Sequence, residues 1–147
     1  MNTVNNEHFF GSKIVETMLE ELIARHQSFQ KLEKTRNIWA IIMIIFSVFM
    51  LFISNEILMI KSEPNQIFTQ ITNEPRFIFL LFLVMLLFSQ FHFLTKKTLK
   101  AEKDFEELRI EIIERSNELW ESDILWEKRH EVYTYMKKVH NINLYFC

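Results

Sequence analysis

The chain has 147 residues, a formal net charge of -2 at neutral pH, and 49% hydrophobic residues. These averages combine two uncharged apolar segments with a highly charged remainder. The balanced charge argues against nucleic-acid binding, which requires a basic surface. The one glycine and one cysteine argue against a glycine-rich phosphate loop and a cysteine metal site, and they rule out an intrachain disulfide.

Residues 1–36 are predicted to form a cytoplasmic N-terminal amphipathic helix. Apolar positions alternate at spacings of four and three, as in a coiled-coil seam, with two polar members: Val15, Leu19, Leu22, His26, Phe29 and Glu33. No small-residue cleavage site follows the first apolar segment, so we expect a retained anchor and no cleavable signal peptide.

Residues 37–60 are predicted to form the first transmembrane helix. The run from Ile38 to Ser54 carries no charge, and as a helix it would extend roughly 25 Å, close to the thickness of a bilayer's hydrocarbon core. The preceding seven-residue frame continues through the small residues Ala40, Ser47 and Ser54, which predicts that they mark a helix-packing face. Glu56 lies beyond this run, where it can reach headgroup water; an ion or proton site is the alternative.

Residues 61–75 are predicted to be an extracytoplasmic loop, and residues 76–95 the second transmembrane helix, with Pro75 in its first turn. His92 is interpreted as an interfacial or helix-packing group, as are Ser89 and Gln90.

Lysine and arginine are concentrated before the first apolar segment and after the second, whereas the loop region offers only Lys61 and Arg76. By the positive-inside rule this distribution predicts a two-span protein of the cell membrane with both termini cytoplasmic.

Residues 96–120 are predicted to form a second cytoplasmic amphipathic helix, in which Arg115 interrupts the apolar spacing. Its seam contains the helix-packing residues Phe105, Leu108, Ile112 and Leu119. We expect this helix to pack on the N-terminal one, and homodimerisation through the same seams is left open. The predicted fold class is therefore an all-α membrane protein, a two-helix transmembrane hairpin extended by coiled-coil-like cytoplasmic helices.

Residues 121–147 are predicted to form an aromatic-rich C-terminal helix and tail, capped at Ser122 or Asp123. The aromatic residues allow two interpretations: the tail folds back on the preceding helices, or it binds a partner protein. The candidates for partner binding are Trp120, Trp126, Tyr133 and Tyr145. Binding to the membrane surface is disfavoured because the segment mixes both signs of charge.

The sequence offers little that indicates catalysis. His130 and Glu131 begin a pattern like H-E-x-x-H, but position 134 is threonine where the second zinc ligand would stand. We therefore predict no catalytic, cofactor-binding or metal-binding residues, no small-molecule substrate and no enzymatic activity.

The segments "KAEKDFEELRIEIIERSNELW" (100–120) and "WEKRHEVYTYMKKVHNINLYF" (126–146) resemble the YpbF-type family of small bacterial membrane proteins. The resemblance implies a two-span protein without an assigned activity. The run "AEKDFEELRIEI" is also similar to the SLATT type of two-span domain. Two hypotheses follow: a non-enzymatic membrane scaffold or regulator that binds another protein or a second copy, and an oligomeric pore-forming effector.

Overall fold

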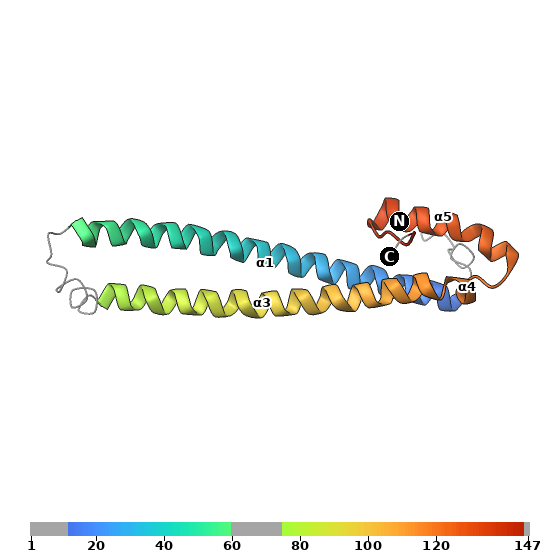
Figure 1. Cartoon of the computed structure of the whole chain (residues 1–147), viewed down its shortest axis with the longest axis horizontal. Helices are drawn as coiled ribbons and strands as arrows, with labels where there is room; N and C mark the ends of the chain where they lie inside the picture. Colours follow the sequence, from blue (N-terminus) through green and yellow to red (C-terminus); the bar gives the residue numbers. More distant parts are fainter. Residues whose placement is uncertain (1–11, 60–74, 146–147) are drawn as a thin grey trace, which may run out of the picture. The chain divides into compact units, whose positions relative to one another are not determined.

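The computed structural model describes residues 12–59 and 75–145. Within these ranges the regular structure is entirely helical (Figure 1): α1 (Lys13–Met59), α3 (Pro75–Glu114), α4 (Ser116–Leu119) and α5 (Asp123–His140). The all-α prediction is confirmed, and Pro75 opens a helix as expected. The predicted loop before Pro75 and the side chains of Ser54 and Glu56 lie outside the described part of the chain.

The chain divides into two units. We call the first the head; its described residues are 12–31 and 99–145. The second is the hairpin, whose described residues are 32–59 and 75–98. Helices α1 and α3 each contribute to both units, because each continues without interruption from a charged segment into an apolar one.

The head is built on the predicted seams of its two long helices. The start of α1 and the end of α3 run antiparallel there (Figure 1), and α5 adds a third helix. The buried apolar side chains form one cluster: Val15, Leu19, Leu22, Phe105, Leu108, Ile112, Leu119, Trp120, Val132, Tyr133, Met136, Ile142 and Leu144. The four residues of the 96–120 segment that were predicted to pack between helices all lie in this core.

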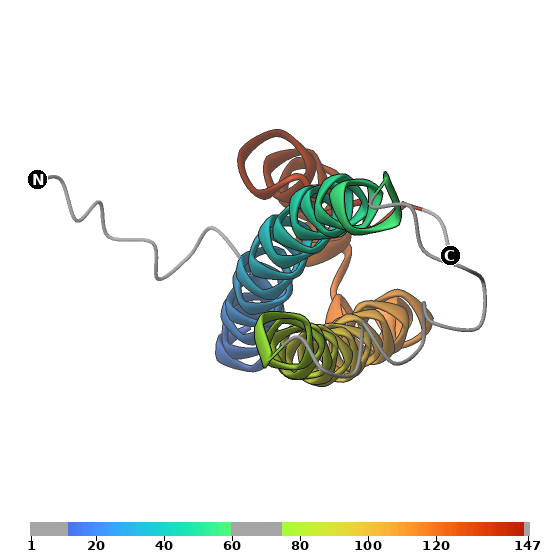
Figure 2. The ribbon, with the colours of Figure 1, turned by 90° about the vertical axis from the view of Figure 1, so that its left-hand side faces the viewer.

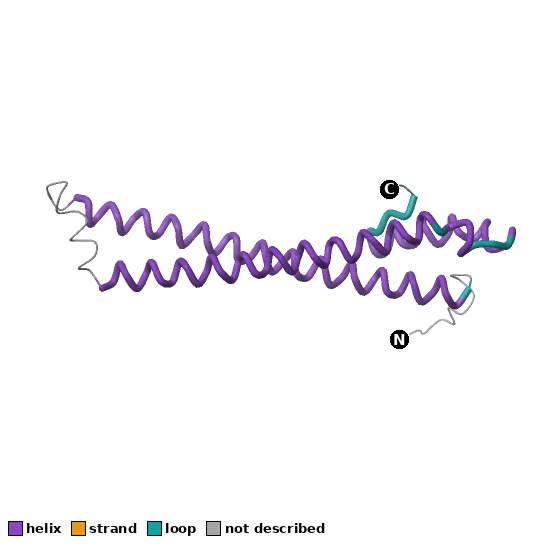
Figure 3. Tube along the Cα trace, turned by 60° about the horizontal axis from the view of Figure 1, so that its bottom comes forward, coloured by secondary structure: helices purple, strands orange, loops and turns teal. Residues whose placement is uncertain are grey.

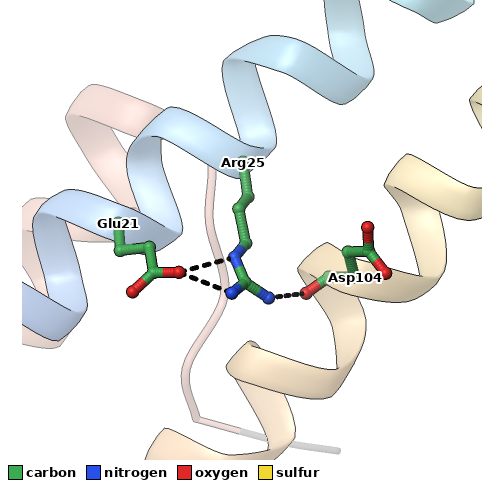
Figure 4. Close-up of polar contacts among 3 residues, drawn as sticks. All are labelled: Glu21, Arg25 and Asp104. Carbon is green, nitrogen blue, oxygen red and sulfur yellow. Dashed lines mark hydrogen bonds and ion pairs between the residues drawn. The ribbon is translucent and has the colours of Figure 1, made fainter.

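Polar members of the seam also join α1 to α3. The imidazole of His26 lies 4.8 Å from the ring of Phe105, measured between ring centroids. The guanidinium of Arg25 donates a 2.7 Å hydrogen bond to the backbone carbonyl of Asp104 (Figure 4) and pairs with Glu21 on its own helix. One arginine thus contacts both helices of the head.

Local signals explain where the chain leaves α3 and enters α5. Arg115 lies between α3 and α4 and reaches the carboxylates of Glu111 at 2.8 Å and Glu118 at 3.1 Å. The Ser122 hydroxyl then accepts a hydrogen bond from the Leu125 amide, which caps α5 as predicted.

The C-terminal tail folds back into the head. Helix α5 ends at His140, and Asn141 follows in the left-handed conformation with φ 58°. The amides of Asn141 and Ile142 both donate to the carbonyl of Met136, a common way to end a helix. The short loop after α5 (teal in Figure 3) buries Ile142 and Leu144, so the fold-back interpretation of the tail is the one that the structure adopts.

The hairpin consists of two antiparallel helical segments, drawn from the end in Figure 2. Large apolar side chains are exposed on both, for example Leu51 and Phe79 at 65% each. Partly buried side chains form one stripe on each helix: Met43, Phe46, Met50 and Ile53 on α1, and Leu80, Leu83, Leu87 and Phe91 on α3.

The α1 stripe corrects one expectation about small residues. Ala40 is partly buried, but Ser47 is exposed, and Phe46 occupies the inward position instead. The prediction extended the seven-residue repeat of the head into the hairpin without a break. The partly buried stripe instead runs through Met43, Phe46, Met50 and Ile53, so Ser47 lies one residue outside it and does not face the second helix.

Candidate functional site

The aromatic residues of the C-terminal segment separate into core and surface positions. Trp120 is 1% exposed and Tyr133 is 5% exposed. Their rings lie edge to face, with the ring centroids 5.6 Å apart. Both were candidates for partner binding. In the structure the tail folds back and encloses Trp120 and Tyr133 in the head core, so neither is exposed to a partner.

Trp126 is the surface member of the set, with 41% of its area exposed. The Arg129 guanidinium lies over its ring, with the central carbon 3.6 Å from the ring centroid. The same guanidinium lies 5.6 Å from the centroid of the Tyr133 ring. The spacing of three and four residues along α5 places all three side chains on one helix face.

Tyr145 fixes the tail against the middle of α5. Its hydroxyl lies 2.9 Å from the Thr134 hydroxyl and 3.2 Å from both the backbone carbonyl oxygen and Nδ1 of His130. Its ring meets the Tyr133 ring at 5.4 Å, nearly perpendicular. The fourth predicted partner residue is thus partly buried and serves the closure of the head.

These residues border a pocket of about 200 Å³, which we call the Arg129 pocket. Its lining comes from α3, α4, α5 and the tail: Ile113, Ser116, Arg129, His130, Tyr133, Leu144 and Tyr145. The lining contains one permanent positive charge, one imidazole and three hydroxyl groups, and it contains no carboxylate. Sequence reasoning missed this pocket, although the Trp126, Arg129 and Tyr133 spacing was visible.

The Tyr133 hydroxyl is buried and has no hydrogen-bond partner among the described residues. Burial raises the pKa of this phenol; the Arg129 charge and the nearby Ser116 hydroxyl oppose the shift only in part. At neutral pH the group therefore remains protonated and can donate a hydrogen bond.

The H-E-x-x-H-like segment is not arranged as a metal site. Thr134 bonds to Tyr145, and residues 12–59 and 75–145 contain no group of three or more metal-ligating side chains.

Ser89, Gln90 and His92 are exposed on α3.

Comparison with known proteins places the chain in a family. The family described as "Protein of unknown function (DUF2663)" matches residues 18–147. The chain is also 33% identical over 132 residues to "Uncharacterized protein YpbF" of Bacillus subtilis (strain 168), with 88% of this chain and 86% of that protein covered. No solved structure matches. The resemblance to the YpbF-type family is confirmed, whereas the SLATT resemblance stays a prediction. The chain belongs to the family described as protein of unknown function (DUF2663).

Proposed function

We propose that this chain is a non-enzymatic membrane protein in which the hairpin crosses the bilayer twice and the head binds another protein. One observation carries the membrane assignment. Both long helices contain an 18-residue window apolar enough to cross a membrane, and neither window is buried in the described structure. A core helix of a soluble protein would be covered by its own chain, so here the cover must come from outside it.

Lipid is the cover that fits the shape of the exposed surface. The exposed side chains lie on both hairpin helices outside the partly buried stripe of each, as expected when every outward face meets hydrocarbon. A protein partner would cover one side and leave the other in water.

The cation distribution supports an orientation with both termini in the cytoplasm. The test is labelling of intact cells with a membrane-impermeant thiol reagent. Ser62→Cys in a Cys147→Ser background should be labelled in intact cells. The native chain, whose one cysteine is Cys147, should be labelled only after lysis and provides the matched control. The reverse pattern would contradict the orientation, and recovery of the untagged chain in a detergent-free supernatant would contradict membrane insertion.

Trp126 supports the partner-binding part of the proposal. Tryptophan and arginine are enriched among the residues that dominate binding energy at protein interfaces, and here an exposed Trp126 is held in place by Arg129. Because it is exposed, it can be replaced without opening the head core.

The partner can be tested by crosslinking in native cells from a photoreactive residue at Lys128, which is exposed near Trp126. We expect Trp126→Ala to reduce a specific crosslinked product at least tenfold. Val139→Ala, which alters another exposed apolar side chain of α5, should not reduce it. Equal products from both variants would contradict the role of Trp126. Membrane depolarisation on overexpression of the chain would instead favour the pore hypothesis.

A further inference from the structure

Arg129 differs from the other arginines whose side chains are described. Each of the others pairs with a carboxylate on its own helix or on the next turn: Arg25 with Glu21, Arg36 with Glu33, Arg109 with Glu106, and Arg115 with Glu111 and Glu118. Arg129 makes no hydrogen bond or ion pair with a described residue, and its contacts are the two aromatic rings. Its charge is therefore held in position but not neutralised.

The stacking leaves the hydrogen-bonding edge of Arg129 available. A guanidinium stacks on an aromatic ring through its flat face, whereas its five N–H donors point outward in its own plane. Packing against Trp126 and Tyr133 thus fixes the group without using these donors. Because Arg129 also lines the pocket, they can serve a ligand there.

Further donors border the same space. The Tyr133 hydroxyl is buried in the wall of the pocket, beside the Ser116 hydroxyl. The Ser116 hydroxyl also lines the pocket. The His130 imidazole also lines the pocket, with Nδ1 facing the Tyr145 hydroxyl. With no carboxylate in the lining, these groups favour a negatively charged ligand.

The size of the pocket limits what it can hold. Its volume of about 200 Å³ lies below the range of about 300–1,000 Å³ typical of pockets for drug-sized ligands. Donors from three residues, one of them the multi-donor guanidinium of Arg129, suit a tetrahedral anion with several oxygens better than a carboxylate with two. A single phosphate group fits both limits.

We propose that the Arg129 pocket binds a phosphate group, with Arg129 as the charged fork and the hydroxyls of Ser116 and Tyr133 as additional donors. The phosphate can belong to a small soluble ester or to the headgroup of an anionic lipid. This proposal goes beyond the function proposed above and requires neither membrane insertion nor a protein partner.

In the first experiment, inorganic phosphate is titrated into the full chain in uncharged detergent, and binding is measured by isothermal titration calorimetry. A titration with chloride at the same ionic strength is the reference. We expect saturable binding that Arg129→Gln weakens at least tenfold. Arg115→Gln removes an exposed arginine from the same head and should leave the affinity unchanged. Circular dichroism spectra of both variants check that the head remains folded.

Two conservative variants keep the test valid if Arg129→Gln unfolds the head. Ser116→Ala removes one donor and should weaken phosphate binding severalfold. Arg129→Lys keeps the charge but loses the planar fork, so it should also bind more weakly than the native chain.

The second experiment separates the two sources of phosphate. The full chain is placed in nanodiscs of phosphatidylcholine with or without phosphatidic acid, and the thermal unfolding of the head is measured. Stabilisation by phosphatidic acid that Arg129→Gln abolishes supports a lipid headgroup. Binding of soluble phosphate without that stabilisation supports a soluble ester. Failure of the native chain to respond to either source, or equal responses of Arg129→Gln and Arg115→Gln, would overturn the proposal.

Discussion

The head and the hairpin use the same two long helices in opposite ways. In the head, Trp120 is 1% exposed and the polar groups at the ends of α5 are capped. In the hairpin, side chains as large as Phe82 are 58% exposed, and its described residues, 32–59 and 75–98, include no third helix. The difference indicates that the head is stabilised by its own core, whereas the exposed apolar surface of the hairpin must be covered by its surroundings. Substitutions in the head should therefore change its free energy of unfolding, and substitutions in the hairpin should change membrane insertion.

The largest effect is expected from opening the head core. Trp120→Ala should destabilise the head by about 3–5 kcal/mol, because it removes a fully buried aromatic side chain and leaves a cavity. Urea unfolding in detergent, followed by hydrogen exchange of the α5 amides, measures this loss. Trp126→Ala is the matched control and should cost about 1 kcal/mol or less, since Trp126 is exposed. Similar losses for both tryptophans would remove the distinction between core and surface positions.

A charge in the hairpin tests its surroundings. Val48→Lys should oppose membrane insertion by about 2.5–3.5 kcal/mol if that side chain faces lipid. The fraction that resists carbonate extraction from membranes reports this change. Ile14→Lys alters a similarly exposed apolar residue of the head, 66% against 61% for Val48, and should leave insertion intact. If Val48→Lys remained fully membrane-bound, lipid would not be what surrounds the hairpin.

A smaller effect is expected where the tail is attached. Arg109 donates a 3.0 Å hydrogen bond to the carbonyl of Asn143, and its side chain is 17% exposed. Arg109→Gln should destabilise the packing of the tail on the head by about 1.5–3 kcal/mol, the range for hydrogen bonds to charged groups. Faster hydrogen exchange at residues 142–145 would show it. Arg115→Gln, which breaks only exposed pairs, should leave this exchange unchanged.

The smallest effect concerns the pH dependence of the head. Burial lowers the pKa of His26, the charge of His140 lowers it further, and Glu106 opposes both; Gln30 and Phe105 also contact the ring. Because the folded pKa lies below the unfolded value, the unfolded chain binds more protons in the interval between them. The stability that His26 contributes should therefore be fully present above the ordinary histidine pKa of 6.5 and should fall as the pH drops through the folded pKa.

Comparison with His26→Gln isolates this contribution from the other histidines. Between pH 7.5 and pH 5, the free energy of unfolding should change less with pH for the variant than for the native chain. An identical slope in both proteins would show that His26 does not supply it.

The elements of the head could be predicted from spacing because seams and caps are local signals. Phe105, Leu108, Ile112 and Leu119 repeat with the helix period, and Ser122 stands directly before an apolar run. Which way an aromatic residue faces was not predictable, since Trp120 and Tyr133 are enclosed only once the tail has reversed at Asn141. The Arg129 pocket depends on the same reversal, which brings Leu144 and Tyr145 beside α5.

At Asn141, the residue that sets the direction of the tail is not one of the residues that form the apolar core of the head. Asn141 is exposed and lies outside the apolar core, yet its positive φ angle sets the direction of the last residues. Asparagine and glycine tolerate this angle, whereas a β-branched residue does not. A substitution at this one surface position would therefore redirect the tail and withdraw Ile142 and Leu144 from the core, although no core side chain is itself replaced.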